Sequence, residues 1–130
     1  GGSGIVILRR LTSATMPGGD LTLVSNATTA LAGAPTKGDL VMTYSNFQGT
    51  ATIGTDLTAE YSADDGGTWT DFSLSASSSQ GTIGGHTILT AHDVSLTSTS
   101  GTLMRYRVKM LNQAAGTKET RIHAVSLGWS

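Results

Sequence analysis

The strictest pattern in this sequence is the alternation over residues 102–111, where four apolar residues are interleaved with three basic ones. The apolar set is Met104, Tyr106, Val108 and Met110, and the basic set is Arg105, Arg107 and Lys109. Successive side chains of a β-strand point to opposite faces, so this segment has one apolar face and one charged face. It is predicted to be a strand that covers a core on one side and meets solvent on the other.

The same period of two occurs in residues 40–47 and 57–63, and shorter apolar or β-branched runs extend the pattern along the chain. Further strands are expected at residues 5–11, 21–24, 68–74, 86–91 and 120–129. Turn-forming residues separate them, as in all-β domains built from short strands. The sequence therefore predicts an all-β fold, an antiparallel β-sandwich of jelly-roll-like type with about 7–8 strands.

Composition favours strands over helices. Charged residues make up 13% of the chain, against a usual share of about 25%, and exposed helices need such residues. The same low charge suits a surface that packs against copies of itself. A chain of 130 residues fits one domain, which typically has about 100–150 residues. We assign residues 5–130 to this domain and residues 1–4, Gly-Gly-Ser-Gly, to a flexible linker or cloning scar.

Charge and residue types exclude several classes of partner. A net charge of −1 gives no field that would attract nucleic acid or an anionic membrane. The absence of cysteine removes disulfides and thiolate sites. No apolar run approaches the about 18 residues of a membrane span. We expect no nucleic-acid partner, no membrane insertion and no cofactor.

Residues 62–69 read Ser-Ala-Asp-Asp-Gly-Gly-Thr-Trp and fit the pattern S-x-D-x-G-x-T-W. This motif resembles the Asp-box found on hairpins of sialidases and other secreted or sugar-active β proteins. The matching positions are Ser62, Asp64, Gly66, Thr68 and Trp69. The carboxylate of the box is suited to accept from backbone N–H groups of its own turn, and its glycine supplies a positive φ. We interpret the box as a self-stabilising hairpin, because a sialidase needs a propeller of about 4–8 blades and several boxes.

A wider resemblance covers about residues 39–130. Its markers are the Asp-box hairpin, the segment 100–108 (Ser-Gly-Thr-Leu-Met-Arg-Tyr-Arg-Val) and the segment 120–129 (Thr-Arg-Ile-His-Ala-Val-Ser-Leu-Gly-Trp). This part of the chain resembles a module near the C-terminus of tailed-bacteriophage fibre-like and other virion structural proteins. The resemblance implies a β-rich fibre module in the virion, usually homotrimeric, that contacts other virion proteins or a host surface glycan. It transfers no functional residues.

Two groups of residues are candidate ligand contacts. Arg105, Arg107 and Lys109 form a basic stripe suited to an anionic glycan or a lipopolysaccharide phosphate, and Arg121 and His123 lie beside it if the last two strands pair as a hairpin. The alternative for the stripe is an ordinary solvated strand face. Trp129 is the best candidate for an exposed aromatic platform, and its alternative is burial under the last strand or at a subunit interface.

The polar residues do not predict a metal site. The three histidines, His86, His92 and His123, match no zinc spacing. Four aspartates are the candidate ligands for calcium, but they form no EF-hand loop. These are Asp56, Asp64, Asp65 and Asp71.

Catalysis has little support in the sequence. The chain has two glutamates, Glu60 and Glu119, and no nucleophile elbow, phosphate-binding loop or paired acid signature. We predict a non-catalytic module that recognises its partner through loops 25–38, 75–85 and 112–119, because loops on a rigid sandwich carry binding. The alternative is a free-standing carbohydrate-binding module. A third hypothesis, a small hydrolase, requires two carboxylates or a Ser–His pair within hydrogen-bonding reach.

Overall fold

The computed structural model describes residues 4–14 and 19–130, and for residues 5–14 it describes the backbone alone. The described residues form ten strands and one 3₁₀ turn. These are β1 (Gly4–Ala14), β2 (Leu21–Val24), β3 (Thr28–Thr29), β4 (Lys37–Gln48), β5 (Leu57–Ser62), β6 (Thr70–Asp71), η1 (Ala76–Ser78), β7 (Ser79–Ile83), β8 (His86–Ser95), β9 (Leu103–Met110) and β10 (Glu119–Trp129). Within this part of the chain, no helix has the length and apolarity needed to cross a membrane.

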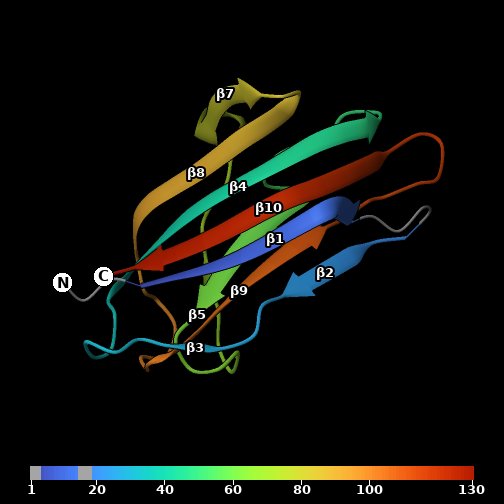
Figure 1. The fold of residues 1–130 in the computed structure, drawn as a ribbon. Helices are drawn as coiled ribbons and strands as arrows, with labels where there is room; N and C mark the ends of the chain where they lie inside the picture. Colours follow the sequence, from blue (N-terminus) through green and yellow to red (C-terminus); the bar gives the residue numbers. More distant parts are fainter. Residues whose placement is uncertain (1–3, 15–18) are drawn as a thin grey trace.

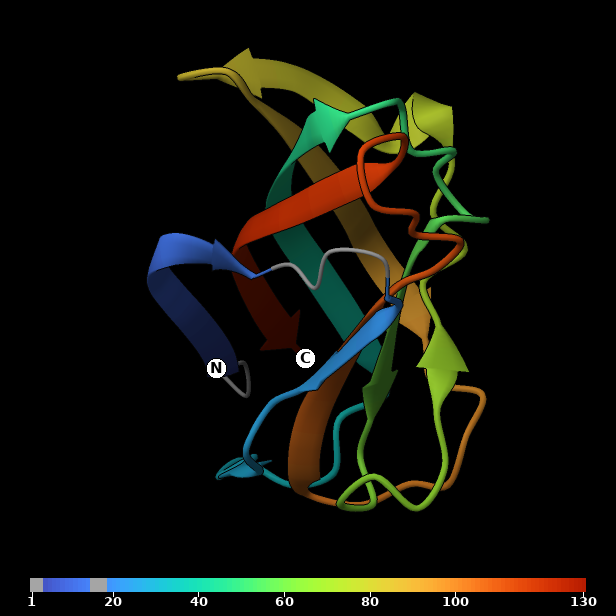
Figure 2. The same cartoon turned by 90° about the vertical axis from the view of Figure 1, so that its right-hand side faces the viewer.

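The strands form two antiparallel sheets. Sheet A has the order β1-β10-β4-β8-β7, and sheet B has the order β2-β9-β5-β6, with β3 also paired to β9. Figure 1 shows the strands of sheet A running next to one another, and Figure 2 shows the two sheets as separate layers. The predicted fold class, an all-β antiparallel sandwich, is confirmed.

The core lies between the two sheets and follows from the alternation in the sequence. Sheet A contributes the inward residues of β4, β8 and β10, and sheet B contributes those of β5 and β9. The fully buried large side chains are Tyr61, Tyr106, Leu40, Met42, Leu57, Leu89, Met104, Met110, Ile122, Leu127, Val108 and Val125. Burial of a side chain of this size contributes about 1.5–3 kcal/mol, so the interleaved apolar rows hold the layers together.

Tyr61 links the two layers directly. It lies on β5 of sheet B, is fully buried, and donates from its hydroxyl to the backbone carbonyl of Val94 on β8 of sheet A at 2.6 Å. Its ring fits over Gly38, where an added Cβ would lie 2.8 Å from the ring. The glycine on β4 therefore makes room for the ring, and the hydrogen bond fixes how the sheets are aligned.

Several predicted boundaries differ from the structure. β1 begins at Gly4, inside the predicted linker, and residues 1–3 lie outside the described residues. The strand predicted at 68–74 is reduced to the two residues of β6, because Thr68 is held in the hairpin turn by Asp64. The Ser/Gly-rich segment predicted as a loop at 75–85 contains η1 and β7.

The last two strands do not pair as a hairpin, so the condition that would place Arg121 and His123 beside the basic stripe is not met. β9 lies in sheet B and β10 lies in sheet A. The connecting segment crosses from one layer to the other, because both strands have an apolar face and these faces meet across the core.

Two β-bulges interrupt the pairing of β4 with β10. Glu119 pairs with Gln48 and Thr120 with Asn46, so Phe47 is the extra residue of one bulge. Ile122 pairs with Tyr44 and Ala124 with Thr43, so His123 is the extra residue of the other. A bulge leaves one residue unpaired and changes the direction of its side chain.

Candidate functional site

The Asp-box forms a closed network at the β5–β6 turn. The Ser62 hydroxyl donates to Oδ1 of Asp64 at 2.7 Å, and the Thr68 backbone N–H donates to the same oxygen at 2.8 Å. The Thr68 hydroxyl donates to Oδ2 at 2.8 Å. These bonds lower the pKa of Asp64. The bond from the Thr68 backbone N–H is the largest cause, and the bond from Ser62 is the next. The carboxylate is therefore occupied by its own hairpin.

The turn itself needs positive φ at two residues. Asp65 has φ 61° and Gly66 has φ 87°, and the backbone N–H of Gly67 donates to the carbonyl of Asp64 at 3.2 Å. This is the geometry of a type I′ hairpin turn, which Asp-Gly favours. An added Cβ at Gly66 would lie 3.3 Å from the Trp69 ring, so Trp69 lies back over the turn.

The basic stripe lies on the outer face of sheet B, as predicted, and its cations have partners. Nε of Arg105 donates to Oδ1 of Asp65 at 2.8 Å, and Nε of Arg107 donates to Oε2 of Glu60 at 2.6 Å. Nζ of Lys109 lies 3.8 Å from the same Glu60 oxygen. Three cations share two carboxylates, which leaves little charge for an anionic ligand.

Arg107 has a second partner. Its guanidinium carbon lies 4.2 Å from the centroid of the Trp69 ring. This cation–π contact covers the indole that the Asp-box places on the outer face of sheet B. The stripe, its carboxylates and the Asp-box thus form one packed surface, which fits the solvated strand face that we gave as the alternative.

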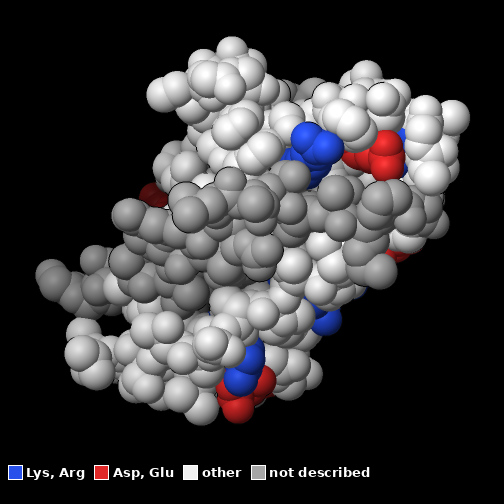
Figure 3. All heavy atoms as spheres, turned by 45° about the vertical axis from the view of Figure 1, so that its right-hand side comes forward, with Lys and Arg blue, Asp and Glu red and all other residues white. Residues whose placement is uncertain are grey.

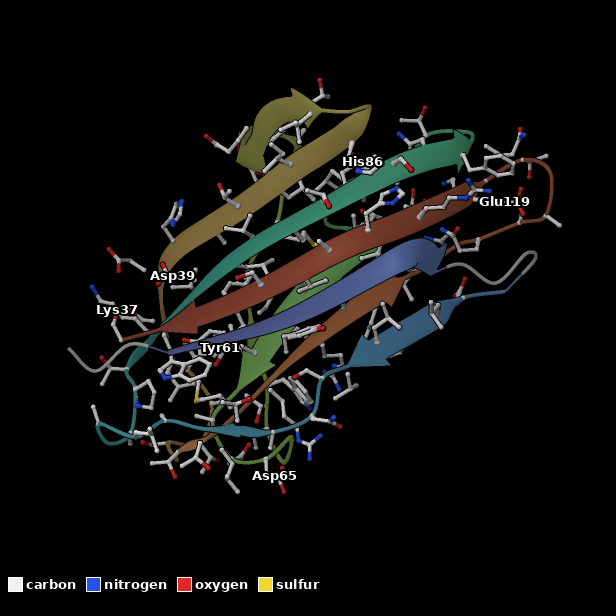
Figure 4. The ribbon with its side chains drawn as sticks, in the orientation of Figure 1. Lys37, Asp39, Tyr61, Asp65, His86 and Glu119 are labelled. Carbon is white, nitrogen blue, oxygen red and sulfur yellow. The ribbon has the colours of Figure 1, made fainter. Side chains whose placement is uncertain are left out.

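Arg121 and His123 lie on the opposite sheet from the stripe, because the hairpin that would have placed them beside it does not form. They are on β10, in sheet A, whereas the stripe is on β9, in sheet B. Figure 4 shows the same separation, with Asp65 of the Asp-box hairpin far from His86 and Glu119 at one end of sheet A.

The outer face of sheet A carries a cluster that the sequence did not predict. The rings of His86 on β8 and His123 on β10 stack over β4, with centroids 3.6 Å apart and planes 7° apart. Below them, a hydrogen bond of 2.7 Å joins Oγ of Ser45 on β4 and Nε2 of His123. The guanidinium carbon of Arg121 lies 3.7 Å from the centroid of the Phe47 ring. We call Phe47, Arg121, His123, His86 and Ser45 the bulge cluster.

Arg121 differs from the cations of the stripe. Within the described residues it has no ion pair, and its Nε is buried without a hydrogen-bond partner. Glu119 lies two residues before it on the same strand and is largely buried, but the two are not within ion-pair distance. The two residues of the chain's first strand that carry charge, Arg9 and Arg10, are both basic. Among the described residues, no carboxylate therefore neutralises the charge of the Arg121 guanidinium.

His123 is held in its neutral form. Burial lowers the pKa of this imidazole, and the nearby His86 and Arg121 lower it further. A neutral ring stacks on His86 without charge repulsion. Its hydrogen bond with Ser45 fulfils the Ser–His condition that we set for a small hydrolase.

The surroundings of Ser45 do not complete a catalytic site. β4 is paired with β10 as far as Gln48 and with β8 as far as Tyr44, so most of its backbone N–H groups are committed to the sheet. A hydrolase needs free N–H donors for the oxyanion and a group that orients the base. Among the described residues, no carboxylate hydrogen-bonds to His123. We interpret the Ser45–His123 pair as a means of holding the imidazole in place.

Trp129 is not an exposed platform. Its side chain is 3% exposed, and an added Cβ at Gly4 would lie 2.9 Å or less from its indole ring. The inward face of β10 places it in the core, which is the burial that we gave as the alternative. Its candidacy as a ligand contact is therefore overturned.

The remaining polar candidates are explained by local structure. Asp56 is 2% exposed and accepts from Lys118 Nζ at 2.8 Å, from the Thr52 backbone at 2.7 Å and from Asn112 Nδ2 at 2.8 Å. The bond from Lys118 is the main cause that lowers the pKa of Asp56 to about 2. His92 lies 3.7 Å from Asp39 at the far end of β8. In the described part of the chain, no three His, Cys, Asp or Glu residues are grouped as a metal site requires.

Comparisons with known proteins add little to these findings. No family model matches the chain, and no curated protein matches it. A crystal structure of FLHE matches with a TM-score of 0.35 and 11% sequence identity, over 99% of this chain and 96% of that chain. A TM-score this low carries no argument about fold or function, and the resemblance to a virion fibre module stays a prediction.

Proposed function

We propose that this domain is a non-catalytic structural module of a virion appendage, such as a bacteriophage fibre, and that it assembles as a homotrimer. The proposal begins from the sequence resemblance in residues 39–130. The observation that supports it best is a band across β8, β4 and β10, on the outer face of sheet A, in which no residue is ionisable. Register places two uncharged rows there, Thr90–Val41–Ser126 and Ile88–Thr43–Ala124. We call these six residues the neutral strip.

The neutral strip suits contact between identical chains. Around a symmetry axis the same residues of each copy approach one another, so charges there would repel. Val41 is 41% exposed and adds apolar surface to the strip. The outer face of sheet B, with its ion-paired stripe, is typical of a surface that faces water. Among the side chains that Figure 3 colours by type, the charged ones gather in a few places, mostly with Lys or Arg next to Asp or Glu.

A non-catalytic function is supported by how four of the described carboxylates are used. Asp56 is bound to Lys118, Glu60 to Arg107, and Asp65 to Arg105. Asp64 is bound within its own hairpin. Groups that already have strong partners are poorly placed to act as a general acid or base.

The alternative, a free-standing carbohydrate-binding module, is favoured by Phe47. This ring is 51% exposed on a rigid strand, whereas Trp129 is buried and Trp69 is covered by Arg107. One half-covered aromatic ring is a small platform. We therefore rank this function second.

Light scattering of the purified chain tests the proposal. We expect a mass of three times 13.3 kDa that stays constant on dilution. Val41→Lys and Ser126→Lys place charge in the neutral strip and should reduce the mass to that of one chain. Asn26→Lys adds the same charge at an exposed position outside both sheets and should leave the trimer intact. A wild-type mass of one chain at all concentrations would overturn the assembly.

A further inference from the structure

We propose that the bulge cluster is a binding site for an acidic saccharide, with Arg121 receiving its carboxylate or sulfate group and Phe47 its ring face. The inference goes beyond the proposed function, because it requires neither a virion nor a trimer. It is carried by three observations: an Arg without an ion pair, a half-exposed aromatic ring in contact with it, and two bulges that place the cluster.

The first step concerns charge. Arg121 has no ion pair among the described residues, and its Nε is buried without a hydrogen-bond partner. Residues 1–18 contain no Asp or Glu, so the neighbouring strand β1 supplies no carboxylate. The register places the backbone of Arg9 on β1 opposite that of Ala124. Guanidinium groups bind carboxylates and sulfates through paired N–H donors.

The charged groups around Arg121 limit the density of negative charge that a bound ligand can carry. Glu119 precedes it on β10 and is 9% exposed. β4 contributes Ser45 and Phe47, and β8 contributes His86, none of which is acidic. A single carboxylate next to the site disfavours a ligand of dense negative charge and allows a ligand with isolated acidic groups.

The second step concerns the shape of the site. Phe47 packs against the guanidinium at 3.7 Å and is still 51% exposed. The ring therefore holds Arg121 in place and presents an apolar surface beside its charge. Saccharide rings have apolar faces and polar edges, so an aromatic ring next to hydrogen-bond donors suits them. The cluster extends over β10, β4 and β8, a width of about 10 Å at the usual strand spacing, which exceeds a single small ion.

The third step concerns the backbone. Phe47 and His123 are the two residues that the β4–β10 pairing skips. Bulges redirect side chains and are frequent next to functional sites. Both bulges lie within this cluster, and their extra residues, Phe47 and His123, supply its aromatic ring and its imidazole. The stacked His86 and the Ser45 hydrogen bond then fix His123, so the site is preorganised.

A single-stranded nucleic acid also combines phosphate with rings that stack. Its binding depends on several cations along the backbone. The net charge of the chain is −1, and the basic stripe is paired and lies on the opposite sheet. The observations therefore favour the saccharide, and nucleic acid is one result that would overturn the proposal.

The test is a titration of the ¹⁵N-labelled chain followed by amide chemical shifts. The probes are an oligogalacturonate, which carries carboxylates, a heparin-derived oligosaccharide, which also carries sulfates, neutral maltohexaose, inorganic sulfate and a short single-stranded DNA. We expect at least one acidic saccharide to shift amides of residues 45–48 and 119–123, and the two acidic probes to show which anion is preferred. Maltohexaose, sulfate and DNA should cause no saturable shift.

Variants locate the site. Arg121→Gln should weaken binding about tenfold or more, and Phe47→Ala should weaken it severalfold. Arg105→Gln removes the same charge from the opposite sheet and should leave the affinity unchanged. The amide spectrum of each variant checks that it is folded, and Phe47→Leu tests the aromatic ring while keeping a large apolar side chain.

Three results would overturn the inference: no binding of either acidic probe, equal loss in Arg121→Gln and Arg105→Gln, or a preference for DNA or maltohexaose. The mass of the chain decides the proposed function separately. A monomer that binds an acidic saccharide through Arg121 would support the inference and overturn the trimer. A trimer that binds no acidic saccharide would support the proposed assembly and overturn the inference.

Discussion

The imidazoles of His86 and His123 stack across an intervening strand, with ring centroids 3.6 Å apart and planes 7° apart. Their strands, β8 and β10, are both neighbours of β4, so their backbones are about 10 Å apart. Both side chains must lean over β4 to meet. Ser45 allows this because its side chain is small, and its hydroxyl hydrogen-bonds to His123.

Stability should decrease in mildly acidic solution because of His123. Its pKa in the folded chain lies below the ordinary value of about 6.5, so the unfolded chain takes up a proton first as the pH falls. The free energy of unfolding is then lower at about pH 5.5 than at about pH 7.5, as urea titrations would measure. Asp56 and Asp64 stay ionised in this range because their pKa values are lowered.

The controls for this effect are two histidine variants. His123→Gln should remove much of the pH dependence, whereas His92→Gln, at an exposed position on β8, should retain it. An unchanged pH dependence in His123→Gln would contradict the assignment.

Asp56 should be important for stability. It is 2% exposed and binds Lys118, Asn112 and the Thr52 backbone, so Asp56→Asn should lower the free energy of unfolding by about 2–3 kcal/mol. The exposed Asp71→Asn should change it by less than about 0.5 kcal/mol. In the wild type, this stabilisation is present above about pH 3.8 and is lost as the pH falls towards the folded pKa of about 2. Equal stabilities of the two variants in urea would refute the role of Asp56.

The Asp-box turn should depend on glycine at position 66. With φ 87°, Gly66→Ala should lower the free energy of unfolding by about 1–2 kcal/mol. Gly66→Asn should lose less, because asparagine tolerates left-handed backbone. Thermal unfolding of the two variants measures the difference, and a greater loss in the asparagine variant would show that contact with Trp69, not backbone conformation, decides the effect.

The contact of Arg107 with Trp69 should depend on the guanidinium group. Arg107→Lys keeps the charge but loses the planar group that lies 4.2 Å from the indole centroid, so we expect a loss of about 1 kcal/mol and a change in tryptophan emission. Arg105→Lys alters the neighbouring ion pair with Asp65 and should leave the emission unchanged. Identical spectra for the wild type and Arg107→Lys would argue against the contact in solution.

Ser45 should not react as a nucleophile. Ser45 is paired with Arg121 in the sheet, and among the described residues no carboxylate hydrogen-bonds to His123, so a fluorophosphonate that labels activated serines should not label Ser45, as intact-mass spectrometry would show. Labelling of the wild type that disappears in both Ser45→Ala and His123→Gln would instead establish the small hydrolase.

The sequence predicted the core elements well, because their signal is local. In β9 the alternation fixed both the strand and the faces of its residues. The Asp-box motif predicted a turn with positive φ at Gly66, and the structure has positive φ at Asp65 as well. The length of β6 was overestimated. Apolar and aromatic residues such as Trp69, Phe72 and Leu74 are typical of strands, but Thr68 is held by Asp64 in the turn.

The bulge cluster could not be assembled from the sequence. Its residues come from three strands, and their meeting depends on β10 lying between β1 and β4 in sheet A. Alternation in β10 gives no information on which sheet the strand joins. The sequence itself contained one local signal. The apolar residues of this strand change from an even position at Ile122 to odd positions from Val125 onward, which indicates a bulge between them.

The pairing of β1 with β10 joins the first and last strands of the described chain, with Gly4 opposite Trp129. During synthesis, the apolar segment Ile5-Val6-Ile7-Leu8 leaves the ribosome long before its partner strand. Until then it is an unpaired apolar segment that can pair with other chains, and β4 lacks its neighbour β10. Folding of sheet A therefore waits for the end of β10, and a chain stalled before that point exposes a segment prone to aggregation or to capture by a chaperone.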